Sequence, residues 1–286
     1  PSVMRVPSAT SSTAPLSPGQ RSALLTLLGD EDPAVYQTIR ARILSEAADV
    51  ESWLRPHALS ADPVLRRRVQ EILQHRARQA MDNDFLAFCL NHGEDMNMED
   101  GCWRLARTQY PEINVPAYQA LLDSYAADLR EHIDPAGAVE GNIAALNEHL
   151  FARLGYRGNE TDYYDPENSY LNRVLDRRTG NPISLCLVYL FVARRLGLPI
   201  AGIGMPGHFL VRYQSSAGDC YIDAFNQGKV LSKADCVKYL LHSAHGFQES
   251  FLAAISPRRT LLRICSNLHQ IYTRLELPEE QARLQR

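Results

Sequence analysis

The clearest hydrophobic pattern in the chain is a run from position 183 to 193 that is apolar on nearly every side of a helix. A helix of this kind is surrounded by protein and does not lie on a surface. Asn181 and Pro182 form a favourable start, as an N-cap followed by the first helical residue. Gly197 stands where a left-handed cap would end the helix. The pattern therefore predicts a central buried helix.

Two short strands are predicted after this helix. Residues 208–213 begin with a histidine that follows a Pro-Gly pair, and residues 220–225 read as the return strand. The polar segment between them, with serines and a glycine, is typical of a turn. If that turn centres near residues 216–217, Asp223 is the diagonal neighbour of His208 on the same face. The pattern predicts either a functional His–Asp pair or two side chains that merely satisfy each other at a hairpin.

The rest of the chain is mainly helical in pattern. Asp-Pro pairs that begin at Asp32 and Asp62 are strong helix starts and resemble HEAT-like hairpins. Apolar residues after Pro257 recur at helical spacing. Further helices are expected over residues 84–90, 101–108, 115–132, 136–154 and 232–242. We expect four parts: a flexible tail (1–18), a helical cap (19–80), the main body (81–255) and a helical segment (256–286).

Several long strings resemble those of a known family. They are FARLGYRGNETDYYD (151–165), PENSYLNRVLDRRTGNPIS (166–184), GMPGHFLVRY (204–213) and YIDAFNQG (221–228). They resemble the bacterial SirB-type (invasion-regulator) family of the transglutaminase-like superfamily. The resemblance runs roughly from Gly29 to the C-terminus, and it implies a tetratricopeptide-like segment at that end. It also implies an α+β fold with a papain/transglutaminase-like core, in which a central buried helix packs on a small antiparallel sheet.

The superfamily implies a Cys–His–Asp triad with the cysteine at the start of the central helix. Carried over to this chain, the histidine matches His208, the aspartate matches Asp223, and the cysteine position falls on Pro182. A proline cannot attack an acyl carbon, so the sequence favours a pseudoenzyme, that is, a non-catalytic interaction or regulatory module with a protein or peptide partner. One alternative is a Cys-dependent hydrolase or acyltransferase that uses Cys186, one helical turn deeper, with Ser184 as another substitute nucleophile. A purely structural role with a vestigial cleft is the third alternative.

The segment before the central helix supplies further candidates for binding. Its aromatic and short polar side chains could line a cleft beside His208 and orient the imidazole or a bound peptide. Alternatively, Asp165 or Asn168 caps a helix over residues 171–178. The candidate cleft residues are Tyr164, Asp165, Asn168, Asn181, Pro182 and Ser184.

Composition narrows the remaining possibilities. A chain of 286 residues with 45% hydrophobic residues can bury a sizeable core, and its formal charge of -3 argues against nucleic acid as a primary partner. No stretch approaches the roughly 20 apolar residues of a membrane span, and no signal peptide is visible. The six cysteines show no C-x-x-C pair and no zinc spacing, so we expect free thiols in the cytoplasm, no metal and no cofactor. The pattern leaves the oligomeric state open.

Overall fold

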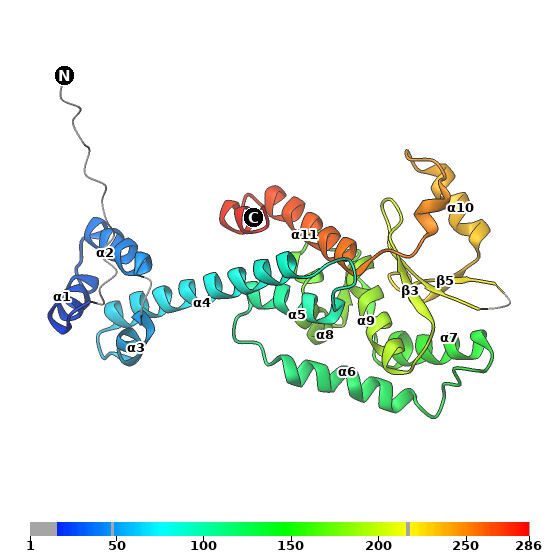
Figure 1. Cartoon of the computed structure of the whole chain (residues 1–286), viewed down its shortest axis with the longest axis horizontal. Coiled ribbons are helices and arrows are strands. Elements are labelled where there is room, and N and C mark those ends of the chain that lie inside the picture. Colours follow the sequence, from blue (N-terminus) through cyan, green and yellow to red (C-terminus); the bar gives the residue numbers. More distant parts are fainter. Residues whose placement is uncertain (1–15, 47–48, 216–217, 286) are drawn as a thin grey trace, which may run out of the picture. The chain divides into compact units, whose positions relative to one another are not determined.

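The computed structural model describes residues 16–46, 49–215 and 218–285. Helices dominate, together with one four-stranded sheet and one two-stranded sheet (Figure 1). The fold is α+β with a transglutaminase-like core, as the family resemblance implied. By its internal packing the chain divides into two compact units, Pro1–Ala80 and Met81–Arg286. Among the described residues, no helix combines the length and the apolar composition that crossing a bilayer requires.

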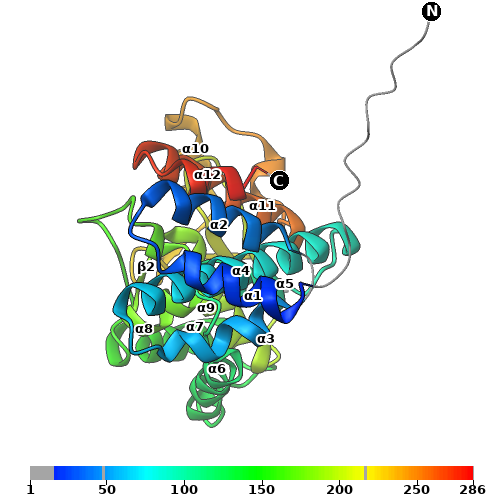
Figure 2. The same ribbon diagram turned by 90° about the vertical axis from the view of Figure 1, so that its left-hand side faces the viewer.

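The first unit is a small helical bundle. Of the tail predicted over residues 1–18, residues 1–15 lie outside the described residues, whereas Ser17 caps the first helix, which begins at Pro18. Figure 2 labels α1 to α4, whose beginnings include both predicted Asp-Pro starts, capped by Asp32 and Asp62. A compact apolar core joins the helices of the unit, with Leu28, Ile43, Val50, Leu54, Val69 and Ile72 fully buried. The helices are α1 (Pro18–Leu28), α2 (Pro33–Ser45), α3 (Val50–Leu54), the 3-10 turn η1 (Arg55–Leu59) and the first part of α4 (Pro63–Asn91).

Helix α4 is longer than the sequence pattern suggests. It runs without a break from the predicted Asp62-Pro63 start into the helix expected over residues 84–90. Neither glycine nor proline occurs between Val64 and His92, so nothing in the chain interrupts the helix before Gly93.

The second unit contains most of the helices. The expected helix over residues 136–154 divides into α7 and a π-helical segment. These helices are α5 (Met98–Gln109), α6 (Val115–Leu129), α7 (Val139–Asn147), η2 (Glu148–Arg153), η3 (Pro166–Asn168), α8 (Leu171–Arg177), α9 (Pro182–Arg195), α10 (Lys233–His242), η4 (Glu249–Leu252), α11 (Pro257–Arg274) and α12 (Pro278–Arg283).

The main sheet is an antiparallel meander with both faces covered. Its strands run in the order β3 (Ile200–Ile203), β4 (Leu210–Tyr213), β5 (Cys220–Asp223) and β6 (Lys229–Leu231). Val211 and Ile222 form a pair that faces the main core, while Leu210 and Tyr221 face a smaller cluster that includes residues of α10. The predicted turn at residues 216–217 lies outside the described residues. A short parallel sheet pairs β1 (Arg157–Gly158) with β2 (Thr179–Gly180).

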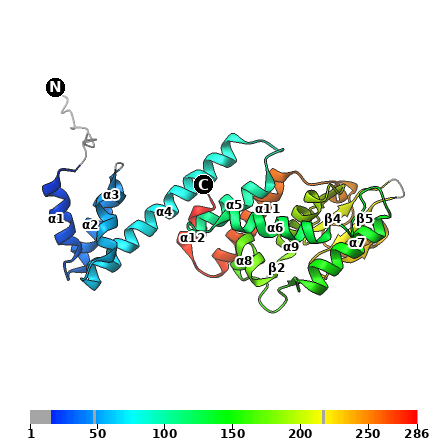
Figure 3. The same ribbon diagram turned by 90° about the horizontal axis from the view of Figure 1, so that it is seen from below.

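Helix α9 is the central helix of the second unit. Every residue from Pro182 to Ala193 is buried. Asn181 caps the helix in a reciprocal capping box, and Gly197, with φ of +72°, adopts the left-handed conformation that the pattern predicted. The helix packs against β3, β4, α6 and α8, and its place beside α6 is seen in Figures 1 and 3.

The C-terminal helices α11 and α12 form a hairpin that belongs to the same core. Leu261, Ile264, Leu268 and Tyr272 of α11 pack in one cluster with α9. Arg283 of α12 forms an ion pair of 2.8 Å with Asp82 in the last part of α4. The hairpin is therefore an integral layer of the second unit.

Candidate functional site

His208 and Asp223 meet where β4 begins and β5 ends. The register that pairs Val211 with Ile222 places both residues at one end of the hairpin. His208 Nε2 lies 2.8 Å from Asp223 Oδ2, and the two side chains are 14% and 7% exposed. Because Nε2 is engaged by the carboxylate, Nδ1 is the ring nitrogen left for another partner.

Asn226 supports the carboxylate of Asp223 from the turn after β5. Its backbone N–H donates to Asp223 Oδ1 at 3.2 Å, and its side-chain amide donates to Oδ2 at 2.8 Å. Burial acts to raise the pKa of Asp223, but the hydrogen bond and charge of His208 and the two bonds from Asn226 outweigh it and hold the pKa below its usual value. The carboxylate is therefore ionised and fixed in place.

The mouth of α9 is closed by its own cap. Asn181 Oδ1 accepts from the backbone N–H of Ser184 at 3.0 Å. The Ser184 hydroxyl accepts from the Asn181 backbone N–H at 3.0 Å and approaches the Asn181 carbonyl at 3.2 Å. Ser184 is buried, and its hydroxyl belongs to the cap. Within the described residues, no hydrogen bond joins Ser184 to His208.

Cys186 lies deeper in α9, within the core. Its side chain is fully buried, and its Sγ donates to the backbone carbonyl of Phe209 at 3.4 Å. Burial raises the pKa of this thiol, and the nearby charge of Asp223 raises it further. Within the part of the chain that the structure describes, no hydrogen bond joins this sulfur to His208. The structure thus places the Cys186 thiol in the core, beside the hairpin.

A cleft opens beside His208 and consists of two adjoining hollows. The small hollow has a volume of about 250 Å³ and lies between the mouth of α9 and α11. The large hollow has a volume of about 990 Å³ and extends from His208 along β5, β6 and α10. We call the two together the His208 cleft. The residues that wall both hollows are Tyr163, Pro182, Gly207 and His208.

Three of the six predicted cleft residues line this cleft. Tyr164, Asn181 and Pro182 line the small hollow. Tyr164 is 48% exposed, and the guanidinium of Arg274 lies 4.2 Å from its ring centre. Pro182 faces the same space as His208, which is where a thiol nucleophile at the helix mouth would have to stand. Asp165, Asn168 and Ser184 line neither hollow.

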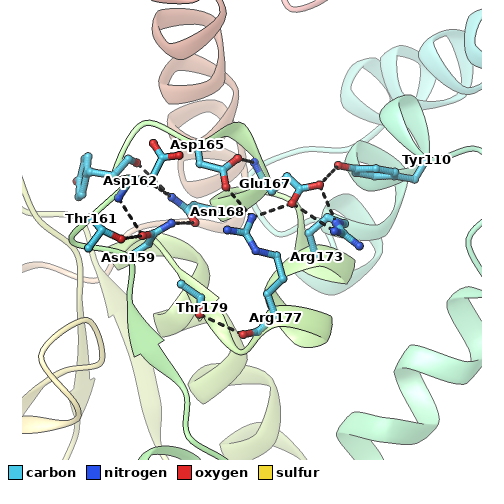
Figure 4. A network of polar contacts seen from close by, with 11 residues as sticks. Tyr110, Asn159, Thr161, Asp162, Asp165, Glu167, Asn168, Arg173, Arg177 and Thr179 are labelled. Atoms are coloured by element: carbon cyan, nitrogen blue, oxygen red, sulfur yellow. Dashed lines mark hydrogen bonds and ion pairs between the residues drawn. The ribbon is translucent and has the colours of Figure 1, made fainter.

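Asp165 and Asn168 instead build the loop before α9, as Figure 4 shows. Asn168 is fully buried; it accepts from Asn159 Nδ2 at 3.0 Å and donates to the carbonyl of Asp162 at 2.8 Å. Its own carbonyl accepts from the backbone N–H of Asn181 at 3.4 Å. Asp165 caps η3, where the sequence alternative expected a cap on the following helix. These residues hold the helix mouth in position and do not touch the cleft.

A chain of ion pairs fixes the other side of this loop (Figure 4). Arg177 lies 2.7 Å from Asp165 and 2.8 Å from Glu167, and Arg173 lies 2.9 Å from Glu167. The hydrogen bond from Arg173, together with the charges of both arginines, lowers the pKa of Glu167 against the effect of burial. The paired arginines are therefore structural partners of the loop.

Sequence analysis missed several residues of the cleft. Tyr163 was noted only within a mixed aromatic segment, Tyr239 comes from α10, and Arg263, Asn267 and Gln270 come from α11. They reach the cleft through tertiary packing, and a residue on an amphipathic helix carries no local signal of which cleft it will face. Among the described residues, no cluster of three or more His, Cys, Asp or Glu side chains could hold a metal ion.

A family model and several known proteins match the part of the chain that contains these residues. The family model of the transglutaminase-like superfamily matches residues 116–266, which span α9, His208 and Asp223. A UPF0162 protein of Xylella fastidiosa strain Temecula1 is 40% identical over 185 residues, which cover 63% of this chain and 66% of that protein. A UPF0162 protein of Pseudomonas aeruginosa is 32% identical over 155 residues, which cover 51% and 56%.

A longer eukaryotic protein shares part of the same region. F-box only protein 21 of Mus musculus is 38% identical over 134 residues, which cover 44% of this chain and 21% of that protein. The matches thus span about two thirds or less of each bacterial relative and about a fifth of the mouse protein. No solved structure matches the chain significantly. Because the family match covers more than half of the 286 residues and contains the site described above, the chain belongs to the transglutaminase-like superfamily.

Proposed function

We propose that this chain is a non-catalytic transglutaminase-like domain, which binds a segment of a partner protein in the His208 cleft and acts as a regulatory module. The observation that carries the proposal is Pro182, an imino acid at the helix mouth that faces the same space as His208. Cys186 does not replace the missing nucleophile in this proposal, since its sulfur is buried and bonded to the carbonyl of Phe209.

The walls of the cleft suit a polypeptide. Tyr163, Tyr164 and Tyr239 are 41%, 48% and 46% exposed, although large aromatic side chains usually bury more of their surface. Tyrosines with an apolar ring and a polar tip are enriched where proteins bind one another. The large hollow adds apolar wall from Met205 and Phe225. An extended peptide would cover these rings and bond their hydroxyls.

The finer family assignment belongs to this proposal. The long strings between residues 151 and 228 support a SirB-type protein, and the α11–α12 hairpin supports a tetratricopeptide-like segment. The match within a small part of F-box only protein 21 supports a module that also functions inside a longer chain. The free thiols of Cys102, Cys186 and Cys236 support a reducing compartment such as the cytoplasm.

Alkylation of the native protein tests the absence of catalysis. The chain is treated with iodoacetamide, and labelling of each cysteine is followed by peptide mass spectrometry. Cys220, which is partly exposed, serves as the internal reference. We expect Cys186 to react far more slowly than Cys220, at a rate that is the same in His208→Ala. Rapid labelling of Cys186 that depends on His208 would overturn the proposal.

A peptide array tests binding in the cleft. Wild type and Tyr239→Ala are incubated with the same immobilised random peptides, and Leu241→Ala is the matched control. Tyr239 lines the large hollow, whereas Leu241 lies on the same helix, is 64% exposed and lines neither hollow. We expect Tyr239→Ala to lose the bound peptides and Leu241→Ala to keep them. Peptides retained equally by both variants would exclude the cleft as the binding surface.

A further inference from the structure

Arg263 brings a positive charge into the cleft without a carboxylate partner. Its Nη2 donates to the backbone carbonyls of Met205 at 2.6 Å and His208 at 2.8 Å. Within the described residues, no acidic side chain forms an ion pair with it, and its Nε and Nη1 donate to no protein acceptor. Burial lowers the pKa of this guanidinium, although Tyr163 and Tyr239 nearby oppose the effect. A partly buried cation of this kind gains by binding an anion.

Several other partly buried arginines of the second unit are paired with acidic side chains. Arg173, Arg195 and Arg283 each form an ion pair with a carboxylate at less than 3.0 Å. Arg263 is held in place by two carbonyls, its guanidinium lies 5.8 Å from the centre of the Phe209 ring, and the residue lines the small hollow. The arrangement fixes the side chain and keeps its charge available.

Further donors stand along the same wall. Asn267 and Gln270 follow Arg263 at intervals of four and seven residues on α11, so the three side chains share one face of the helix. No hydrogen bond engages the amides of Asn267 and Gln270 within the described residues. The opposite wall is the beginning of α9, the positive end of a 14-residue helix. No acidic side chain lines the small hollow in the described part of the chain.

The shape of the cleft indicates which anion fits. The small hollow, of about 250 Å³, adjoins the large one of about 990 Å³ at His208, so a peptide in the large hollow can end in the small one. A carboxylate carries one negative charge, which the single charge of Arg263 balances. A phosphate group, with its greater charge, would be expected to meet more than one full cation, and Arg263 is the one arginine or lysine that lines this hollow among the described residues.

We propose that the small hollow binds the C-terminal carboxylate of a peptide whose preceding residues lie in the large hollow. The inference rests on the proposed function, because it names the end of the polypeptide that the cleft takes. Arg263 holds the carboxylate, and Asn267 and Gln270 donate to the last peptide unit. His208 lies at the junction of the hollows, beside the backbone of the bound segment.

Nuclear magnetic resonance on the full chain tests the inference with three probes. These are acetyl-trialanine with a free carboxylate, the same peptide as its carboxamide, and acetyl-Ala-Glu-Ala carboxamide, which carries its carboxylate on a side chain. The Nε–Hε signal of Arg263 is assigned from its disappearance in Arg263→Lys. We expect the free acid to shift this signal saturably and to bind about tenfold more tightly than the carboxamide.

Two variants define the origin of that difference. Arg263→Gln is expected to abolish the preference for the free acid. Arg259→Gln, the matched control, removes an exposed arginine one turn earlier on α11 and outside the hollow, and it is expected to keep the preference. The contrast between acid and carboxamide in wild type needs no variant, so the test stands even if Arg263→Gln does not fold.

The outcomes separate the inference from the proposed function. Equal binding of acid and carboxamide, with shifts of the Tyr163 and Tyr239 ring signals, would overturn the carboxylate site and leave peptide binding in the cleft intact. Equal binding of the glutamate peptide and the free acid would overturn the assignment to a C-terminus. If none of the three probes shifts any signal of the cleft, both the inference and the peptide-binding function are wrong.

Discussion

At the scale of single residues, the proposed absence of catalysis depends on Pro182. The pair of His208 and Asp223 is complete, with its Asn226 support, and would orient an imidazole for proton transfer. Proline supplies neither a thiol nor a backbone N–H to stabilise a developing oxyanion. The chain therefore keeps a His–Asp pair that would serve a nucleophile, but the residue at the nucleophile position is a proline.

Pro182→Cys should give the cleft a reactive thiol. The start of a helix and a neighbouring imidazolium both lower the pKa of a cysteine, and lowering it from about 8.5 to about 7.5 raises the thiolate fraction at pH 7 by roughly eightfold. Peptide-resolved alkylation at pH 7 should show the introduced thiol reacting faster than Cys220. Adding His208→Ala should slow it; a rate that ignores His208 would mean that the imidazole does not face the helix mouth.

Asp223→Asn should destabilise the chain in a pH-dependent way. The variant weakens the bonds to His208 and Asn226, and we expect a loss of about 1–3 kcal/mol in the free energy of unfolding. The folded-state pKa of Asp223 lies below its ordinary value of 3.8, so its stabilisation is present above that pH and is lost as the pH falls through the folded-state value. Chemical denaturation across a pH series should show the gap between wild type and variant closing in acid; a gap that grows in acid would contradict this.

At the scale of elements, α9 shows how local sequence and tertiary contacts combine. Its apolar run, its Asn-Pro start and its Gly197 end are all visible in the sequence, and the structure confirms each. The π-helical segment η2 and the length of α4 were not predicted, because helical propensity carries little information about where a helix continues. The ends of elements depend on packing more than their middles do.

Asn181→Ala should lower the free energy of unfolding by more than the loss of an ordinary N-cap does. Loss of an N-cap costs about 0.5–2 kcal/mol. Asn181 also donates to Ser169 Oγ at 3.0 Å within the core, so we expect the loss to lie toward the upper end of that range. Ser232→Ala removes the same kind of capping box from α10 at an exposed site and is the control. Thermal unfolding that shows an equal or larger loss for Ser232→Ala would refute the additional role of Asn181.

Two glycine-to-alanine substitutions should change the free energy of unfolding in opposite directions. A Cβ on Gly158 of β1 would lie 2.6 Å from the Phe225 ring, and overpacking of this kind costs about 1–3 kcal/mol. Gly141 of α7 has open space around its Cβ position, so Gly141→Ala should stabilise the chain by about 0.5–1 kcal/mol. Urea denaturation of both variants checks the pair, and Phe225→Leu should partly rescue Gly158→Ala. Stabilisation by Gly158→Ala would show that the ring is not in contact with β1.

At the scale of the whole molecule, the described residues form separate cores: one in the first unit, and a main core with a smaller cluster in the second. Ile72 is fully buried in the first unit, and Ile264 is buried in the core around α9. Much of this organisation could be predicted from the sequence, since the Asp-Pro starts and the apolar run are local signals. The composition of the cleft could not be predicted, because Tyr239 and Arg263 each lie more than thirty residues after His208 and reach the cleft from α10 and α11. The position of each residue on its own helix is equally typical of a side chain that faces solvent.

Core substitutions should act within their own unit. Ile72→Ala is expected to lose about 2–5 kcal/mol from the first unit, and Ile264→Ala a similar amount from the second. Hydrogen exchange resolved by peptide should show faster exchange in α1 to α3 for the first variant and in α9 for the second. Equal acceleration everywhere in both variants would mean that the chain unfolds as a single cooperative body.

The shared wall of the two hollows also has a thermodynamic consequence. Because Tyr163, Pro182, Gly207 and His208 border both spaces, a molecule that settles in one changes the surroundings offered to a molecule in the other. Linkage requires such an influence to be mutual and equal in free energy. Two short ligands would then show reciprocal cooperativity, positive or negative, and a single longer ligand would gain avidity from occupying both compartments at once.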